Sequence, residues 1–107
     1  MSIEEMFALL KTILVGGQPI EVAFDHFTSK NIQPPFIVFS VENVYTLKAD
    51  DKVHYQENDY IVDLCNDVKN VELETQLETL FNDNYLPYDK ECAYIDSEQM
   101  FQTRYFI

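Results

Sequence analysis

Four side chains of this sequence could bind a transition metal through nitrogen or sulfur: His26, His54, Cys65 and Cys92. A structural zinc site takes its ligands in short pairs, such as two cysteines separated by two residues or two histidines separated by three. No two of the four side chains have such a spacing. The pattern therefore favours surface histidines and core cysteines, and it predicts neither a metal site nor another cofactor.

Acidic residues cluster around a predicted reversal of the chain. Asp50 and Asp51 lie at the turn, and Glu57 and Asp59 follow it. A calcium loop needs carboxylates at alternating positions and a glycine for its sharp bend, and this segment has no glycine. A solvated turn is therefore the better interpretation of the cluster.

Patterns typical of nucleophilic catalysis or phosphate binding are also missing. None of the four serines stands in a Gly-x-Ser-x-Gly motif. The adjacent glycines Gly16 and Gly17 follow a predicted helix, whereas a phosphate cradle would precede one. We therefore expect a protein that is not an enzyme.

The composition predicts one acidic globular domain over residues 1–107. Nineteen acidic residues outnumber seven basic ones, which gives a formal net charge of −12, and Arg104 is the sole arginine. Such a surface repels phosphates, because nucleic-acid binders use lysine and arginine to displace counterions. The apolar run at the N-terminus is short and interrupted by charges, and no basic leader precedes it. We expect a cytosolic chain with two reduced cysteines.

Hydrophobic periodicity predicts two helices and five strands. Pro87 places the start of the penultimate strand at a sheet edge. Hairpins imply antiparallel pairing, and two amphipathic helices can cover one face of a sheet. The expected fold is α+β, a two-layer sandwich with an antiparallel-rich sheet of four to five strands and two helices on one face, in the order α-β-β-β-α-β-β. The predicted helices are 3–15 and 70–83, and the predicted strands are 19–27, 36–47, 53–65, 85–96 and 100–107.

Local details of these elements can also be predicted. Gly16 and Gly17 are expected to stop the first helix, and Asn58-Asp59 suggests a bulge or second turn in the return strand. The second helix should bury one stripe made of Leu73, Leu77, Leu80 and Phe81. Its outer face should carry Glu72, Glu74 and Glu78.

Aromatic residues are in excess, with seven tyrosines and eight phenylalanines. Most lie at strand spacing and are expected in the core. Tyrosine beside acidic residues is usual at protein interfaces. The last strand would be an exposed edge closed by a neighbouring subunit, or it is paired within its own sheet. The tyrosines expected at the rim of the sheet are Tyr45, Tyr55, Tyr85, Tyr88 and Tyr94.

Nearly the whole chain resembles a family of small phage proteins. The segments that carry the resemblance are "PPFIVFS", "ADDKV" and "YIVDLCNDVKNVELE", the last a strand followed by a capped, acid-rich helix. None of them is a catalytic signature. The chain looks like the tail-terminator, or tail-completion and head-to-tail joining, proteins of long-tailed bacteriophages and prophages of Gram-positive bacteria.

This resemblance implies a hexameric ring without catalysis. Such a ring closes the head-proximal end of the tail tube, contacts the major tail tube protein and the head connector or stopper protein, and lets DNA pass through its lumen without specific binding. It implies a place at the tail–head junction of the virion, reached by assembly in the host cytoplasm and without a membrane. We expect segment 46–59 to project from the sheet toward a ring neighbour or the lumen. The residues expected at a subunit or partner interface are Leu47, Lys48, Asp50, Asp51, Lys52, Tyr55, Glu57, Arg104 and Phe106.

The strong acidity also fits a different class of protein, an inhibitor that mimics DNA and blocks a nucleic-acid-binding host enzyme. A mimic should space its carboxylates along one face in the way that phosphates are spaced. In this sequence the acids are instead scattered over the predicted hairpins and both helices, which favours the first interpretation.

Overall fold

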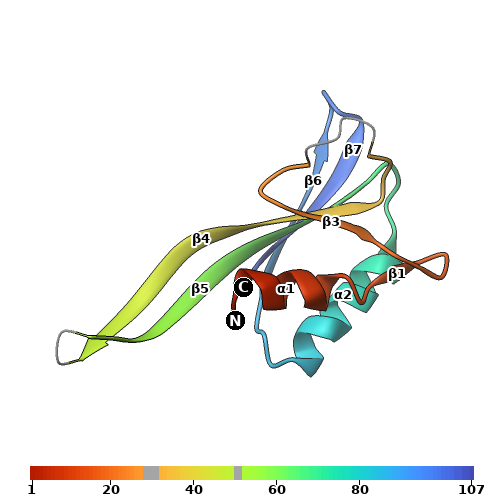
Figure 1. Cartoon of the computed structure of the whole chain (residues 1–107). Coiled ribbons are helices and arrows are strands. Elements are labelled where there is room, and N and C mark those ends of the chain that lie inside the picture. The colour runs from red at the N-terminus through yellow and green to blue at the C-terminus, as the bar shows by residue number, and fades with distance from the viewer. Residues whose placement is uncertain (28–31, 50–51) are drawn as a thin grey trace.

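The computed structural model describes residues 1–27, 32–49 and 52–107, and within residues 43–57 it describes the backbone alone. The described chain is an α+β fold with two helices, a five-stranded mixed sheet and a small two-stranded sheet (Figure 1). The predicted fold class is therefore confirmed. The elements are α1 (Ile3–Leu10), β1 (Leu14–Val15), β2 (Gln18–Pro19), β3 (Glu21–Phe24), β4 (Phe36–Ala49), β5 (Lys52–Asn66), α2 (Val71–Asp83), β6 (Asp89–Ile95) and β7 (Met100–Phe106).

The large sheet has the strand order β3-β4-β5-β7-β6. Three of its four pairings are antiparallel, and the short β3 runs parallel to β4. β6 lies at one edge, as Pro87 predicted. β7 has a partner on each side, so the final strand is paired within its own sheet and is not an exposed edge.

Both helices pack on the same face of this sheet and share one core (Figure 1). The alternation of β5 is as predicted, with Tyr60, Val62 and Leu64 buried on one face. Burying these apolar side chains between two layers is the main force that holds the fold. The helical side of the core consists of Met6, Leu10, Leu73, Leu77 and Phe81, and the sheet adds Ile37, Phe39 and Tyr105.

The first helix is shorter than residues 3–15, and that prediction is wrong at its C-terminal end. The helix ends at Leu10, and Leu14 and Val15 then pair with Gln18 and Pro19 in a tight hairpin. Gly16 and Gly17 have φ angles of +58° and +82°, so they form the turn of this hairpin. The apolar spacing misled the prediction because Ile13 is also buried, but from the turn that follows the helix.

The two helices begin at Ile3 and Val71, within one residue of the starts of the predicted ranges. The Ser2 hydroxyl accepts a hydrogen bond from the Glu5 amide, and the Glu5 carboxylate accepts one from the Ser2 amide, which completes a capping box. The Asn70 side chain accepts a hydrogen bond from the Leu73 amide at the start of α2. Both caps satisfy backbone donors that have no partner within the helix.

The β4–β5 ladder is irregular near the position where the sequence predicted a bulge. The extra residue is Glu42 on β4, between the pairs Val41–Tyr60 and Asn43–Asp59. The bulge therefore lies on the strand opposite Asn58-Asp59. A second register shift follows between Leu47 and Lys48.

Candidate interaction surface

β4 and β5 are much longer than the strands beside them, with 14 and 15 residues. β3 pairs only with residues 36–39 of β4, and β7 pairs only with residues 61–66 of β5. Beyond those stretches, within the described chain, the two strands form a ladder only with each other. We call this two-stranded part, residues 43–49 and 52–59, the arm.

The arm projects away from the body of the molecule (Figure 1). The longest principal dimension of the molecule is 51 Å, against 28 and 24 Å for the other two. The radius of gyration of 15.1 Å exceeds the value of about 13 Å that is usual for a compact domain of this length. A two-stranded ribbon is only marginally stable in water, so the arm is a segment that would gain stability from a partner.

The root of the arm is tied to both ends of the described chain. The Tyr60 hydroxyl donates a hydrogen bond of 2.8 Å to the Met1 carbonyl, and the Asn58 amide donates one of 3.0 Å to the Tyr60 hydroxyl. Tyr60 and Ile107 exchange two backbone hydrogen bonds. The arm therefore starts from a fixed base.

Five of the nine predicted interface residues lie on the arm: Leu47 and Lys48 on β4, and Lys52, Tyr55 and Glu57 on β5. The register makes Leu47 and Tyr55 cross-strand partners and places Glu57 opposite Tyr45. The structure describes only the backbone at these positions. Asp50 and Asp51 lie outside the described residues.

The other two predicted interface residues do not join the arm. Arg104 and Phe106 lie on β7, inside the sheet, opposite Asp63 and Ile61 of β5. The Arg104 guanidinium donates two hydrogen bonds to the Asp63 carboxylate, at 2.8 and 3.1 Å. Its charge is thus already paired within the monomer, so Arg104 is mainly a residue that joins two strands.

A polar cluster that the sequence did not predict joins α2 to β6 and β7. The Tyr105 hydroxyl donates a hydrogen bond of 2.8 Å to Glu78, and the Tyr88 hydroxyl donates one of 3.2 Å. The Lys90 ammonium lies 3.0 Å from carboxylate oxygens of both Glu78 and Glu74. Burial raises the pKa of Glu78, but the hydrogen bonds from Lys90 and Tyr105 outweigh it, and the net shift is below the ordinary value of 4.5.

Glu74 corrects the prediction that the acids of this helix lie outside. Its side chain is only 5% exposed and lies 3.0 Å from the Lys69 ammonium, in addition to its contact with Lys90. Glu72 is exposed as predicted. A buried carboxylate is tolerated only when paired. Lys69 lies just before the helix and Lys90 lies on β6, so the spacing of apolar residues within the helix could not reveal this pairing.

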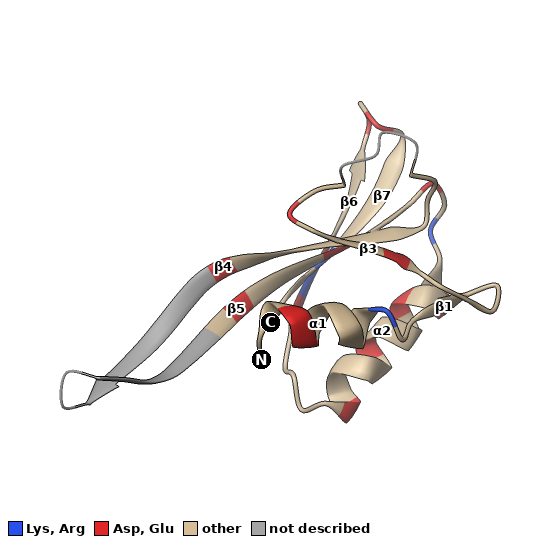
Figure 2. Ribbon diagram, viewed as in Figure 1, with Lys and Arg blue, Asp and Glu red and all other residues tan. Residues whose placement is uncertain are grey.

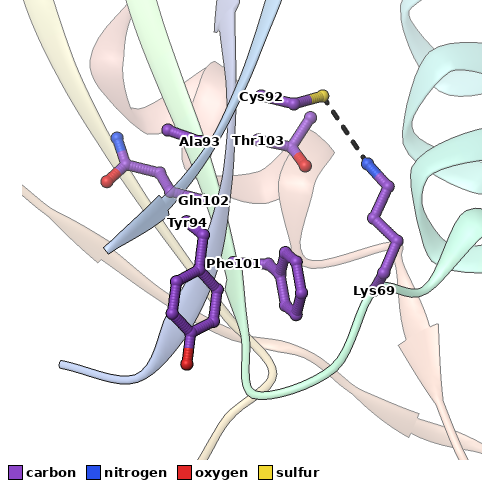
Figure 3. Close-up of a pocket in the computed structure, with 7 residues that line it drawn as sticks. All are labelled: Lys69, Cys92, Ala93, Tyr94, Phe101, Gln102 and Thr103. Carbon is purple, nitrogen blue, oxygen red and sulfur yellow. Dashed lines mark hydrogen bonds between the residues drawn. The ribbon is translucent and has the colours of Figure 1, made fainter. Parts of the chain in front are cut away.

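An open pocket of about 230 Å³ lies beside the C-terminal end of β6 (Figure 3). The ring centroids of Tyr94 and Phe101 are 4.8 Å apart in an edge-to-face contact. The Lys69 ammonium donates a hydrogen bond of 3.6 Å to the sulfur of Cys92. Cys92 is exposed, so the prediction of a core cysteine is wrong at this position. We call this the aromatic pocket, and its lining consists of Lys69, Cys92, Ala93, Tyr94, Phe101, Gln102 and Thr103.

Acidic residues are spread over the described surface and do not form one row. Figure 2 shows them on both helices, near the root of the arm and at the β6–β7 turn. The described residues contain no group of three or more side chains arranged to hold a metal ion. No helix in the described part of the chain is long and apolar enough to cross a membrane.

Comparison of the sequence with known protein families and with curated proteins gave no match.

Proposed function

We propose that this chain is a phage virion assembly protein that forms a ring at the head-proximal end of the tail tube and joins the tail to the head connector. The arm is the observation that carries the proposal. It is a two-stranded ribbon that leaves the sheet and pairs with no third strand in the described chain. Such ribbons gain stability when a partner packs against them.

The acidity of the chain supports a ring through which DNA passes. Each copy has a formal charge of −12, and a lumen lined by such copies repels the passing duplex. At physiological salt this repulsion acts over roughly 8–10 Å, which is enough to matter in a narrow pore. In this proposal the protein has no catalytic role, and its partners are further copies, the tail tube protein and the head connector protein.

The DNA-mimic alternative has less support from the geometry of the acids. Glu74 and Glu78 are neutralised by Lys69 and Lys90, and Asp63 is neutralised by Arg104. Carboxylates that are paired inside the monomer cannot stand in for a row of phosphates. A mimic would also bind its target enzyme as a monomer or dimer, whereas a terminator assembles into rings.

Deletion of the gene from the phage or prophage that encodes it tests the proposal. Electron microscopy of the resulting lysate should show unattached heads and tails of irregular length. Complementation with the wild-type gene should restore joined particles. Normal virions without the gene would disprove the proposal.

A further inference from the structure

Tyr85 occupies a position where glycine is the usual residue. It follows the C-cap of α2 with a φ angle of +56°, in the left-handed region. The Leu86 amide donates to the Phe81 carbonyl at 2.9 Å, and the Tyr85 amide donates to the Asn82 carbonyl at 3.2 Å. These two bonds define a Schellman motif, in which glycine avoids the steric cost that a side chain incurs.

The fold gains little contact from the Tyr85 side chain in return for this strain. The residue is 92% exposed, the highest value among the exposed large hydrophobic side chains of the described chain. Strained backbone of this kind occurs at functional sites, and exposed tyrosines are frequent anchors of protein interfaces. The neighbouring residue Leu86 packs against the core and supplies the hydrophobic contact that usually accompanies a Schellman motif. The ring of Tyr85 is therefore free for a partner.

The aromatic pocket offers a site for such a ring. It lies beside Tyr94 near the end of β6, whereas Tyr85 precedes the start of that strand, so the two features are at opposite ends of β6. Its size of about 230 Å³ is below the 300–1,000 Å³ usual for drug-sized ligands. Tyr94 and Phe101 provide aromatic walls, and Figure 3 shows the Lys69 ammonium on the other side of the pocket.

Local charge favours a second copy of this chain as the occupant. Copies that each carry −12 repel one another except where their contacting surfaces lack net negative charge. The pocket lining contains one cation, Lys69, and no carboxylate, and the Lys69 ammonium is already paired with Glu74 at 3.0 Å. The Tyr85 ring is uncharged, so it can enter the pocket without meeting an unpaired acid of the lining.

We propose that Tyr85 of one copy inserts into the aromatic pocket of the next copy. The two surfaces differ, so the contact is heterologous and links copies head to tail, which generates a ring when the rotation closes. This inference rests on the proposed ring and names a contact that holds it. One side chain is a small part of a stable interface, and the arm supplies further area.

Two variants of the purified chain test this contact by sedimentation velocity. Tyr85→Gly removes the ring and also relieves the backbone strain, so the thermal unfolding midpoint should stay at or above that of the wild type. Cys92→Phe fills the pocket at an exposed position. Each should weaken self-association by about thirtyfold or more, the scale of an interface hot spot. Leu14→Ser, at a 50% exposed position outside both surfaces, is the matched control and should associate normally.

A mixture of the two variants gives the sharpest outcome. Cys92→Phe retains Tyr85, and Tyr85→Gly retains the open pocket, so the mixture should form pairs but no larger species. Wild-type association by Tyr85→Gly alone would overturn the contact and leave the ring proposal intact. Filaments in place of rings would support the contact between Tyr85 and the aromatic pocket but would overturn the proposal that the copies close into a ring. Failure of the wild-type chain to associate at its highest soluble concentration would overturn both.

Discussion

Arg104 and Asp63 face each other across β7 and β5, and two nitrogens of the guanidinium donate to separate oxygens of the carboxylate at 2.8 and 3.1 Å. This two-pronged geometry requires the planar guanidinium, which a lysine cannot reproduce. The pair is partly hydrated, because the side chains are 40% and 18% exposed. Its contribution to stability is therefore moderate.

Arg104→Lys should lower the free energy of unfolding by about 0.5–1 kcal/mol without affecting self-association. The reason is that Arg104 joins strands within the monomer, although the sequence placed it at an interface. Urea denaturation measures the first effect and sedimentation the second. A large loss of self-association with an unchanged free energy of unfolding would instead show that Arg104 belongs to an interface between copies.

Tyr105→Phe should lower the free energy of unfolding by about 1–2 kcal/mol, because the buried hydroxyl donates to a charged carboxylate. Tyr88→Phe is the matched control, since its bond to the same Glu78 is longer, at 3.2 Å, and its ring is less buried. Urea denaturation should rank Tyr105→Phe as the more damaging change. An equal or reversed ranking would contradict the described cluster.

Glu74→Ala should lower the free energy of unfolding by about 2 kcal/mol, and Glu72→Ala on the same helix should change it by less than about 0.5 kcal/mol. Glu74 is buried against two lysines, whereas Glu72 faces solvent. The loss is smaller than for a fully buried pair, because Lys69 and Lys90 can regain water. Chemical denaturation of both variants measures the difference, and equal effects would place Glu74 on the outside.

Stability should fall as the pH drops below about 4.5, in part through Glu78. The folded state lowers the pKa of this carboxyl below its ordinary value, so the unfolded chain binds a proton first as the pH falls. The stability from this group is thus present above the unfolded pKa and lost as the pH passes through the folded one. Thermal unfolding at several pH values should show a shallower acid dependence for Glu78→Gln than for the wild type, and parallel curves would contradict the assignment.

The periodicity of the sequence predicted the fold class because apolar spacings of two and of 3.6 residues directly specify buried faces. The buried face of β5 and both helix starts followed from such local patterns, as did three of the four residues predicted for the buried stripe of α2, namely Leu73, Leu77 and Phe81. The end of α1 did not, because Ile13 continues the helical spacing from a turn. Gly16 and Gly17 fit a helix stop as well as a hairpin turn, and the sequence alone does not distinguish the two.

The candidate surface was predictable only in outline. The acidic turn of segment 46–59 indicated a projecting hairpin, and the backbone of its described part does project. The pairing of Glu74 with Lys90 depends on long-range packing, and so does the aromatic pocket. Tyr85 had a local signal, since "NDNYLP" ends the helix without the glycine expected after its cap.

Replacing residues 45–57 with Asn-Gly tests the role of the arm most directly. Val44 and Asn58 are register partners, so a two-residue turn between them should close the shortened hairpin without disturbing the sheet. The measurement is sedimentation velocity of this variant beside the wild type, with unfolding curves to confirm that the body remains folded. The account predicts rings for the wild type and folded monomers for the variant, whereas rings of equal size and stability from both proteins would contradict it.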